Sequence, residues 1–122
     1  MSGTDEDLAV WCLATNLVES VYRCTQSFPK QEQYGLTNQI RRAVVSVPSN
    51  IAEGKGRSSD RELVQFLNHA RGSLYELQTQ LRIASRLRYL QPDSARELDS
   101  QAAEVGRLLN GLIRAFRRIP AA

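Results

Sequence analysis

The sequence contains little of the chemistry on which most enzyme sites depend. Its 122 residues include one histidine, His69, and two cysteines, Cys12 and Cys24. A metal site needs several ligands, and no cysteine or second histidine lies near His69 in the sequence. A serine or cysteine nucleophile needs a base, for which His69 is the only candidate. We therefore expect no catalytic, cofactor or metal site.

Long apolar runs are missing as well. No stretch of 18 apolar residues occurs, so we expect no transmembrane helix, and the acidic N-terminus lacks the pattern of a secretion signal. Cys12 and Cys24 are separated by about 18 Å along one predicted helix. A disulfide requires Cα atoms within about 7 Å, so the two cannot pair within the chain. These absences favour a cytoplasmic protein.

The charge balance is basic and rests on arginine. Lysine and arginine number 16 against 13 acids, which gives +3. Asp5, Glu6 and Asp7 account for three acids, so the remainder carries 16 minus 10, or +6. Only Lys30 and Lys55 are lysines. Arginine binds phosphate and carboxylate in a bidentate manner, which favours recognition of anions. A GC-rich genome is the alternative explanation.

Four segments carry the three- and four-residue apolar spacing of amphipathic helices. They cover residues 5–27, residues 36–53, a third segment that ends near residue 90, and a fourth that starts at Pro92. Capping boxes are expected at Thr4 with Asp7 and at Ser59 with Glu62. Long helices with short connections predict an all-α, antiparallel up-and-down four-helix bundle. We expect one domain over residues 1–122, with residues 1–4 flexible.

The last three segments each have one predicted inner face. These faces comprise Leu36, Ile40, Ala43, Val44, Val47 and Ile51; then Leu63, Phe66, Ala70, Leu74, Leu77, Leu81 and Ala84; then Ala95, Leu98, Ala102, Val105, Leu109, Leu112, Phe116 and Ile119.

The first segment is apolar on two nearly opposite faces. One stripe contains Leu8, Trp11, Val18 and Tyr22, completed by Thr15 and Thr25; the other contains Val10, Leu13, Leu17, Val21, Cys24 and Phe28. One face can serve the bundle, and the other needs a neighbour. Our candidate oligomer interface is Val10, Leu13, Leu17, Val21 and Phe28.

Pro48 falls inside the second helical segment. It removes the hydrogen bond to residue 44, so we expect a kink or a division there. A strand at residues 43–47 is the competing interpretation. Asn50 could satisfy backbone groups that Pro48 leaves free, and we favour this structural role over a role in ligand binding.

Basic residues gather around the second and third segments. Gly54-Lys55-Gly56 does not match a phosphate-binding loop, because it follows a helix and lacks the required spacing. Two cations at a helix N-terminus could still hold a phosphate, although an ordinary solvated turn is the alternative. Our candidate nucleic-acid-binding residues are Arg41, Arg42, Lys55, Arg57, Arg71, Arg82 and Arg86.

Two helical faces combine arginine with other polar residues. The third segment carries Arg71, Tyr75, Gln78, Arg82 and Arg86 on one face, extended by Arg88 and Tyr89, and the fourth carries Arg107, Gly111, Arg114 and Arg118. Arginine with interleaved tyrosine suits a nucleic-acid backbone and exposed bases. The alternative is salt bridging between subunits, for which Glu76, Glu97 and Glu104 are available.

The stretch Ser-Val-Pro-Ser-Asn-Ile-Ala-Glu-Gly at residues 46–54 is distinctive. Together with residues 28–36, 62–67 and 104–112, it resembles the four-helix-bundle family first noted as proteins encoded in 23S ribosomal RNA intervening sequences. The resemblance covers residues 8–119. It implies a cytosolic bacterial bundle that assembles as a pentameric ring, with distant kinship to retroelement accessory proteins that bind nucleic acid and a reverse transcriptase.

The sequence therefore predicts a non-enzymatic, ring-forming protein that binds RNA or DNA, with RNA favoured. The alternative is a scaffold that docks another protein, such as a polymerase. Expected partners are the chain itself, nucleic acid or a protein, and no membrane.

Overall fold

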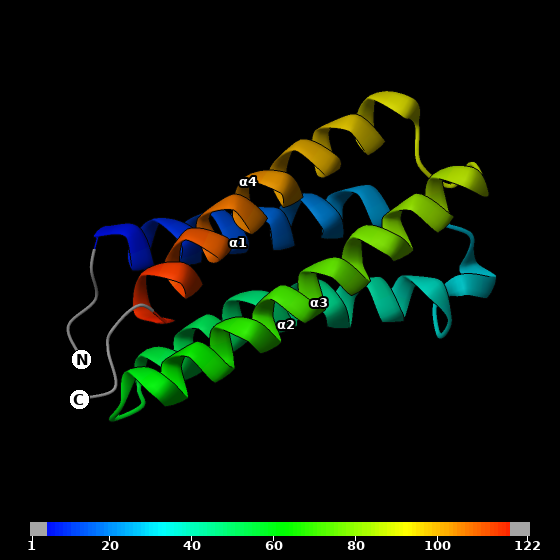
Figure 1. Ribbon diagram of the computed structural model, residues 1–122. Coiled ribbons are helices and arrows are strands. Elements are labelled where there is room, and N and C mark those ends of the chain that lie inside the picture. Colours follow the sequence, from blue (N-terminus) through cyan, green and yellow to red (C-terminus); the bar gives the residue numbers. More distant parts are fainter. Residues whose placement is uncertain (1–4, 118–122) are drawn as a thin grey trace.

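Four helices form the bundle in the computed structural model, which describes residues 5–117, with side chains from residue 8 (Figure 1). They are α1 (Asp5–Thr25), α2 (Leu36–Lys55), α3 (Asp60–Arg86) and α4 (Pro92–Arg117), with a short 3₁₀ helix, η1 (Lys30–Glu32), between α1 and α2. The predicted all-α antiparallel bundle is confirmed. No helix in the described part is long and apolar enough to cross a membrane.

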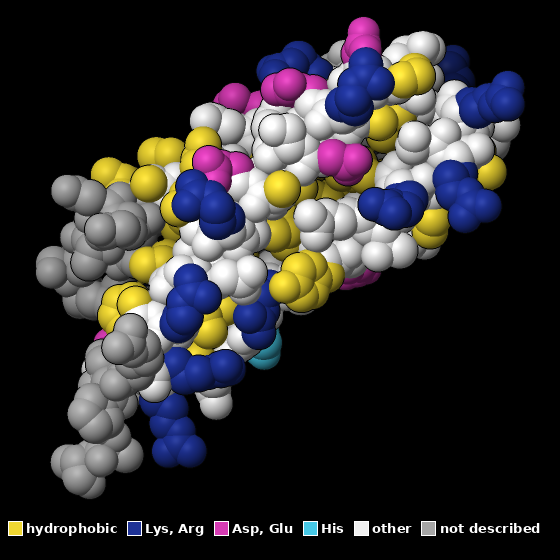
Figure 2. Space-filling view, turned by 45° about the horizontal axis from the view of Figure 1, so that its top comes forward, with side chains coloured by type: hydrophobic (Ala, Val, Ile, Leu, Met, Phe, Trp, Pro, Cys, Tyr) yellow, Lys and Arg dark blue, Asp and Glu magenta, His cyan; other side chains and the backbone are white. Residues whose placement is uncertain are grey.

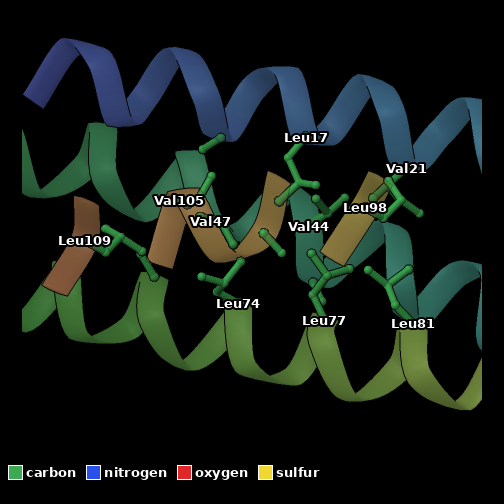
Figure 3. Packing of buried hydrophobic residues seen from close by; sticks show 14 of the residues in the cluster. Leu17, Val21, Val44, Val47, Leu74, Leu77, Leu81, Leu98, Val105 and Leu109 are labelled. Atoms are coloured by element: carbon green, nitrogen blue, oxygen red, sulfur yellow. The ribbon is translucent and has the colours of Figure 1, made fainter. Parts of the chain in front are cut away.

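Each helix packs against two others around a shared centre. α1 contacts α2 and α4, and α3 also contacts α2 and α4. The predicted inner faces of α2, α3 and α4 are buried or half-buried wherever they are described; Ile119 lies outside the described residues. A buried leucine contributes roughly 1.5–3 kcal/mol, so this core is the main source of stability. Residues shown in the core are Leu17, Val21, Val44, Val47, Leu74, Leu77, Leu81, Leu98, Val105 and Leu109 (Figure 3).

The assignment of the two faces of α1 was wrong. Four of the five residues predicted at the oligomer interface, Val10, Leu17, Val21 and Phe28, are buried in the core of their own chain, and Leu13 packs half-buried against it. They cannot meet another subunit while they fill the bundle.

The opposite stripe of α1 exposes three large apolar side chains, whereas its Val18 is half-buried and its Thr25 is buried. Leu8 is 55% exposed, Trp11 38% and Tyr22 40%. Arg41 of α2 reaches Tyr22, so this stripe borders α2, on which Val45 is also 39% exposed. We call Leu8, Trp11, Tyr22 and Val45 the α1–α2 apolar stripe.

Helix α2 continues through Pro48 without division, and residues 43–47 are helical, so the strand interpretation is wrong. Asn50 has a structural role, but its partner is the Ser46 carbonyl and not the Val44 carbonyl that Pro48 leaves without its helical donor. Its Nδ2 donates to the Ser46 carbonyl at 2.8 Å and to Ser46 Oγ at 3.0 Å. Ser46 Oγ and Ser73 Oγ share a hydrogen bond of 2.8 Å, which ties α2 to α3.

Gly54 lies at a close contact between α2 and α3. A Cβ built on Gly54 would lie 2.9 Å from Phe66 Cβ and 3.1 Å from Leu63 Cδ1. Both atoms belong to α3 side chains that are buried or half-buried, so a larger residue would push the helices apart.

Helix α3 ends at Arg86 rather than near residue 90. Arg88 adopts a left-handed conformation, with φ of 65°. Its N–H donates to the Ser85 carbonyl at 3.0 Å, and the Tyr89 N–H donates to the Ala84 carbonyl at 2.9 Å. These two bonds satisfy the last carbonyls of the helix in a Schellman motif, which stops the helix before the sequence pattern ends.

Tyr89 then connects this corner to the segment between α1 and α2. Its hydroxyl donates to Glu32 Oε2 at 3.0 Å, and its ring lies 5.5 Å from that of Phe28. The hydrogen bond to Glu32 raises the pKa of Tyr89 above its usual 10.0, with smaller contributions from burial and from the negative charge. Glu32 Oε1 also accepts from the Leu36 N–H at 3.0 Å, which caps α2.

The predicted cap of α3 is also formed. Ser59 Oγ accepts a hydrogen bond from the Glu62 N–H at 3.2 Å. The box predicted at Thr4 and Asp7 lies outside the described side chains.

Arg41 fastens α2 to α1. Its Nε donates to Thr25 Oγ1 at 2.9 Å, its Nη2 donates to the Tyr22 carbonyl at 3.4 Å, and its guanidinium lies 4.5 Å from the centre of the Tyr22 ring. The neighbouring Arg42 points elsewhere and is exposed.

Gly54 and Gly72 provide a matched test of the α2–α3 approach. Gly54→Ala should lower the free energy of unfolding by roughly 1–3 kcal/mol because its Cβ has no room. Gly72→Ala should raise it by roughly 0.5–1 kcal/mol, since nothing lies within 4 Å of the added Cβ and alanine favours the helix. Urea denaturation followed by circular dichroism measures both, and equal effects would contradict the close packing at Gly54.

Arg41 and Arg42 provide a second matched pair. Arg41→Ala should destabilise the protein by roughly 1–2 kcal/mol, because it removes a hydrogen bond from a charged group and a cation–π contact. Arg42→Ala should change stability by less than about 0.5 kcal/mol, as is usual at exposed positions. Thermal and urea denaturation distinguish them, and a neutral Arg41→Ala variant would rule out this role.

Candidate nucleic-acid interface

The seven cations predicted to bind nucleic acid separate into three places. Arg41 and Arg42 lie on α2, with Arg41 facing α1. Lys55 and Arg57 lie at the turn between α2 and α3, and Arg71, Arg82 and Arg86 lie on α3. The fold therefore does not bring all seven together. Arg41 faces α1, whereas Arg82 and Arg86 lie on the side of α3 that faces α4.

The turn cation Arg57 is already engaged within the chain. Its Nη2 forms an ion pair of 2.8 Å with Glu53 Oε2, and its guanidinium lies 4.6 Å from the centre of the Phe66 ring. The neighbouring N-terminus of α3 carries Asp60 and Glu62 in its first turn. These acids oppose a second anion there, so the turn is a weaker candidate than the sequence indicated.

The polar face predicted on α3 does lie on one side, towards α4. Tyr75, Gln78, Arg82 and Arg86 line a shallow groove of about 720 Å³ with Asp99 of α4. Tyr75 is 52% exposed, so its ring is accessible beside the two arginines. Asp99 is the one carboxylate among the described residues that line this groove.

A second groove, of about 380 Å³, lies nearer the end of α4. Arg71 of α3 lines it with Asn110, Ile113, Arg114 and Arg117 of α4. The candidate set omitted Arg114 and Arg117. The sequence signal was available for Arg114, which was recognised as part of a basic face, but the antiparallel register that brings α4 beside Arg71 comes only from the fold.

We call Arg71, Arg82, Arg86, Arg114 and Arg117 the α3–α4 arginine face. Figure 2 shows dark-blue side chains spread along this side of the molecule, gathered most closely near the end at which α4 finishes. Within residues 8–117, no carboxylate lies within 4.0 Å of a guanidinium nitrogen of these five residues. No described carboxylate therefore neutralises the charge of these arginines.

The acids proposed as arginine partners behave differently within one chain. Glu104 pairs with Arg107. Glu76 accepts a hydrogen bond from Gln80, and Glu97 accepts one from Gln101. Arg118 lies outside the described residues. Of these three acids, Glu104 is therefore the one that pairs with an arginine among the described residues.

His69 lies exposed on α3, with its ring 6.0 Å from that of Phe66. Within the described residues, no three histidine, cysteine or acidic side chains gather in an arrangement that could hold a metal ion. The arginine face can hold and orient anions, and we see no arrangement on it that would activate a nucleophile.

We compared the chain with curated proteins, solved structures and protein families. No curated protein matches the chain. Among solved structures, a crystal structure of a protein described as of unknown function, from the S23 ribosomal protein family of Bacteroides thetaiotaomicron, has a TM-score of 0.81 and 22% sequence identity, covering 89% of this chain and 98% of that one. At this identity the likeness supports the fold alone.

The family itself is identified by sequence. The family model described as 23S rRNA-intervening sequence protein matches residues 6–111. This range includes the segment at residues 46–54, in which Ser46 bonds to Ser73 of α3 and Gly54 allows α3 to approach closely. The chain therefore belongs to the family of 23S rRNA-intervening sequence proteins.

Proposed function

We propose that this protein binds nucleic acid without catalysis, through the α3–α4 arginine face. The observation that carries the proposal is the set of five arginines on one side of the bundle that have no carboxylate partner within residues 8–117. Guanidinium groups match phosphate geometry, and a surface with many unneutralised cations attracts a polyanion.

Single-stranded RNA is the class of ligand that this surface fits best. The exposed ring of Tyr75 lies beside Arg82 and Arg86 in one groove, and bases of single strands stack on such rings while cations contact the phosphates. Helix faces that present mostly arginine contact the backbone, so we expect little dependence on sequence.

We further propose that the protein assembles into a ring through the α1–α2 apolar stripe, with five subunits as the family resemblance implies. The stripe exposes Trp11 and three other large apolar side chains, and water contact with such a patch is unfavourable. The stripe and the arginine face lie on different helices, so burial of the stripe does not itself cover the arginines. A ring joins two different surfaces of each subunit, and the stripe is one of them. A ring would repeat the basic surface and strengthen its field.

Replacement of two phosphate contacts should change the salt dependence of binding. Each phosphate contact on a single strand contributes about 0.7 to the slope of log affinity against log salt. Arg82→Ala with Arg86→Ala should therefore reduce the slope by about 1.4 on single-stranded RNA. Fluorescence anisotropy over a series of salt concentrations measures it.

The control for that experiment is Arg23→Ala with Arg42→Ala. It removes the same charge from exposed positions on α1 and α2, and the slope should stay within experimental error. Absence of any binding by the wild type at low salt would overturn the proposal. Co-purification with a polymerase instead of nucleic acid would favour the scaffold alternative.

Assembly is tested by introducing charge into the apolar stripe. Leu8→Glu with Trp11→Glu should convert the assembly into monomers at micromolar concentration, because carboxylates resist burial. Light scattering coupled to gel filtration gives the mass, and circular dichroism checks that the helices remain. Leu87→Glu, at an exposed position directly after α3, should leave the mass unchanged, and a monomeric wild type would refute assembly.

A further inference from the structure

The groove at the end of α4 contains more arginines than any other groove that the structure describes. Three guanidinium groups, from Arg71, Arg114 and Arg117, line it, and the described residues around it include no carboxylate. The neighbouring groove contains Asp99. Among the residues that the structure describes, the end groove is therefore a local concentration of positive charge without a counter-ion.

Arg71 is held in place by neutral groups. Its Nη1 donates to Asn110 Oδ1 at 3.0 Å and its Nη2 donates to Asn68 Oδ1 at 2.8 Å. An amide oxygen fixes the orientation of a guanidinium without cancelling its charge. Arg57, Arg96 and Arg107 are oriented by carboxylates instead.

The two amides occupy only part of the hydrogen-bonding capacity of Arg71. A guanidinium has five N–H donors, so three remain for a ligand. Arg71 is half-buried, which limits its motion, and the buried side chain of Ile113 forms part of the groove lining. An apolar neighbour lowers the local dielectric and strengthens the attraction between the guanidinium and an anion.

Arg114 and Arg117 are exposed and lie three residues apart on α4. At this spacing they project from one side of the helix, so both can approach an anion held by Arg71. Three positive charges exceed the single charge of an internal phosphodiester. A terminal phosphate carries about 1.5 to 2 negative charges at neutral pH and three acceptor oxygens, which matches the groove better.

We propose that Arg71, Arg114 and Arg117 form a site for a dianionic phosphate group, which holds the phosphorylated end of a nucleic-acid strand. Asn68 and Asn110 are positioning residues that orient Arg71. This inference rests on the proposed binding of nucleic acid for its physiological ligand, whereas the phosphate chemistry follows from the groove itself.

The first test uses inorganic phosphate as the probe. Calorimetric titration at constant ionic strength should detect binding to the wild type. Arg114→Gln with Arg117→Gln should weaken it at least about tenfold, because hydrogen bonds to charged groups are the stronger ones. Arg42→Gln with Arg23→Gln removes the same charge elsewhere and should change it less than about twofold. Equal losses in both double variants would overturn the site.

The positioning role needs variants that leave the net charge unchanged. Asn110→Leu should weaken phosphate binding several-fold by releasing Arg71, and Asn110→Gln should restore part of it. Asn38→Leu is the control, since Asn38 is exposed on α2. Circular dichroism shows whether each variant is folded. Unchanged binding by a folded Asn110→Leu variant would contradict the positioning role.

The second test compares one RNA oligonucleotide with and without a 5′-phosphate, and with and without a 3′-phosphate. Binding should be at least about tenfold tighter for one phosphorylated end, and the Arg114/Arg117 double variant should abolish that preference. Equal affinities with and without end phosphates would overturn this inference but leave the proposed function intact. Binding of inorganic phosphate without binding of any oligonucleotide would support the site and overturn the proposed function.

Discussion

The rotation of α3 about its own axis is the constraint on which the rest of the molecule depends. Leu74, Leu77 and Leu81 are buried between the other helices and fix that rotation. A helix turns by about 100° per residue, so residues on either side of this leucine row are directed to opposite neighbours. Ser73 meets α2, and Arg71 meets α4. Burial of one apolar row therefore determines where the polar groups of α3 lie.

The α2–α3 contact stabilises this arrangement with small and polar residues. Gly54 permits the close approach, and Ser46 Oγ shares a hydrogen bond with Ser73 Oγ while it accepts another from Asn50 Nδ2 on its own helix. The most recognisable stretch of the sequence thus has a physical role in packing. The candidate functional surface lies on the other side of α3, where the side chains are long, charged and exposed.

The two sides of the bundle differ in how their arginines are used. Arg41 connects α2 to α1, and its guanidinium contacts a hydroxyl, a carbonyl and an aromatic ring. Arg71 is also fixed, but by amide oxygens that leave donors free. Both residues are half-buried arginines with short contacts. What distinguishes them is whether the charge faces a groove or a neighbouring helix.

The sequence alone determined the number of helices, the inner faces of α2, α3 and α4 and most of the helix limits, because apolar spacing and capping residues are local signals. It also placed Arg71, Tyr75, Arg82 and Arg86 on one face, since that follows from helical periodicity. Only the tertiary structure decided which apolar face of α1 is buried. Both faces satisfy the same periodicity, and the choice depends on how each fits against α2 and α4.

The structure also decided how separate helices combine. Arg71 lies beside Arg114 and Arg117 because α3 and α4 run antiparallel in one register, and no local pattern specifies that register. Arg88 ends α3 in a left-handed conformation, although its residue type favours continuation of the helix. The contact of Tyr89 with Glu32, formed across 57 residues of sequence, holds that corner in place. Such contacts arise only after the core has brought distant segments together.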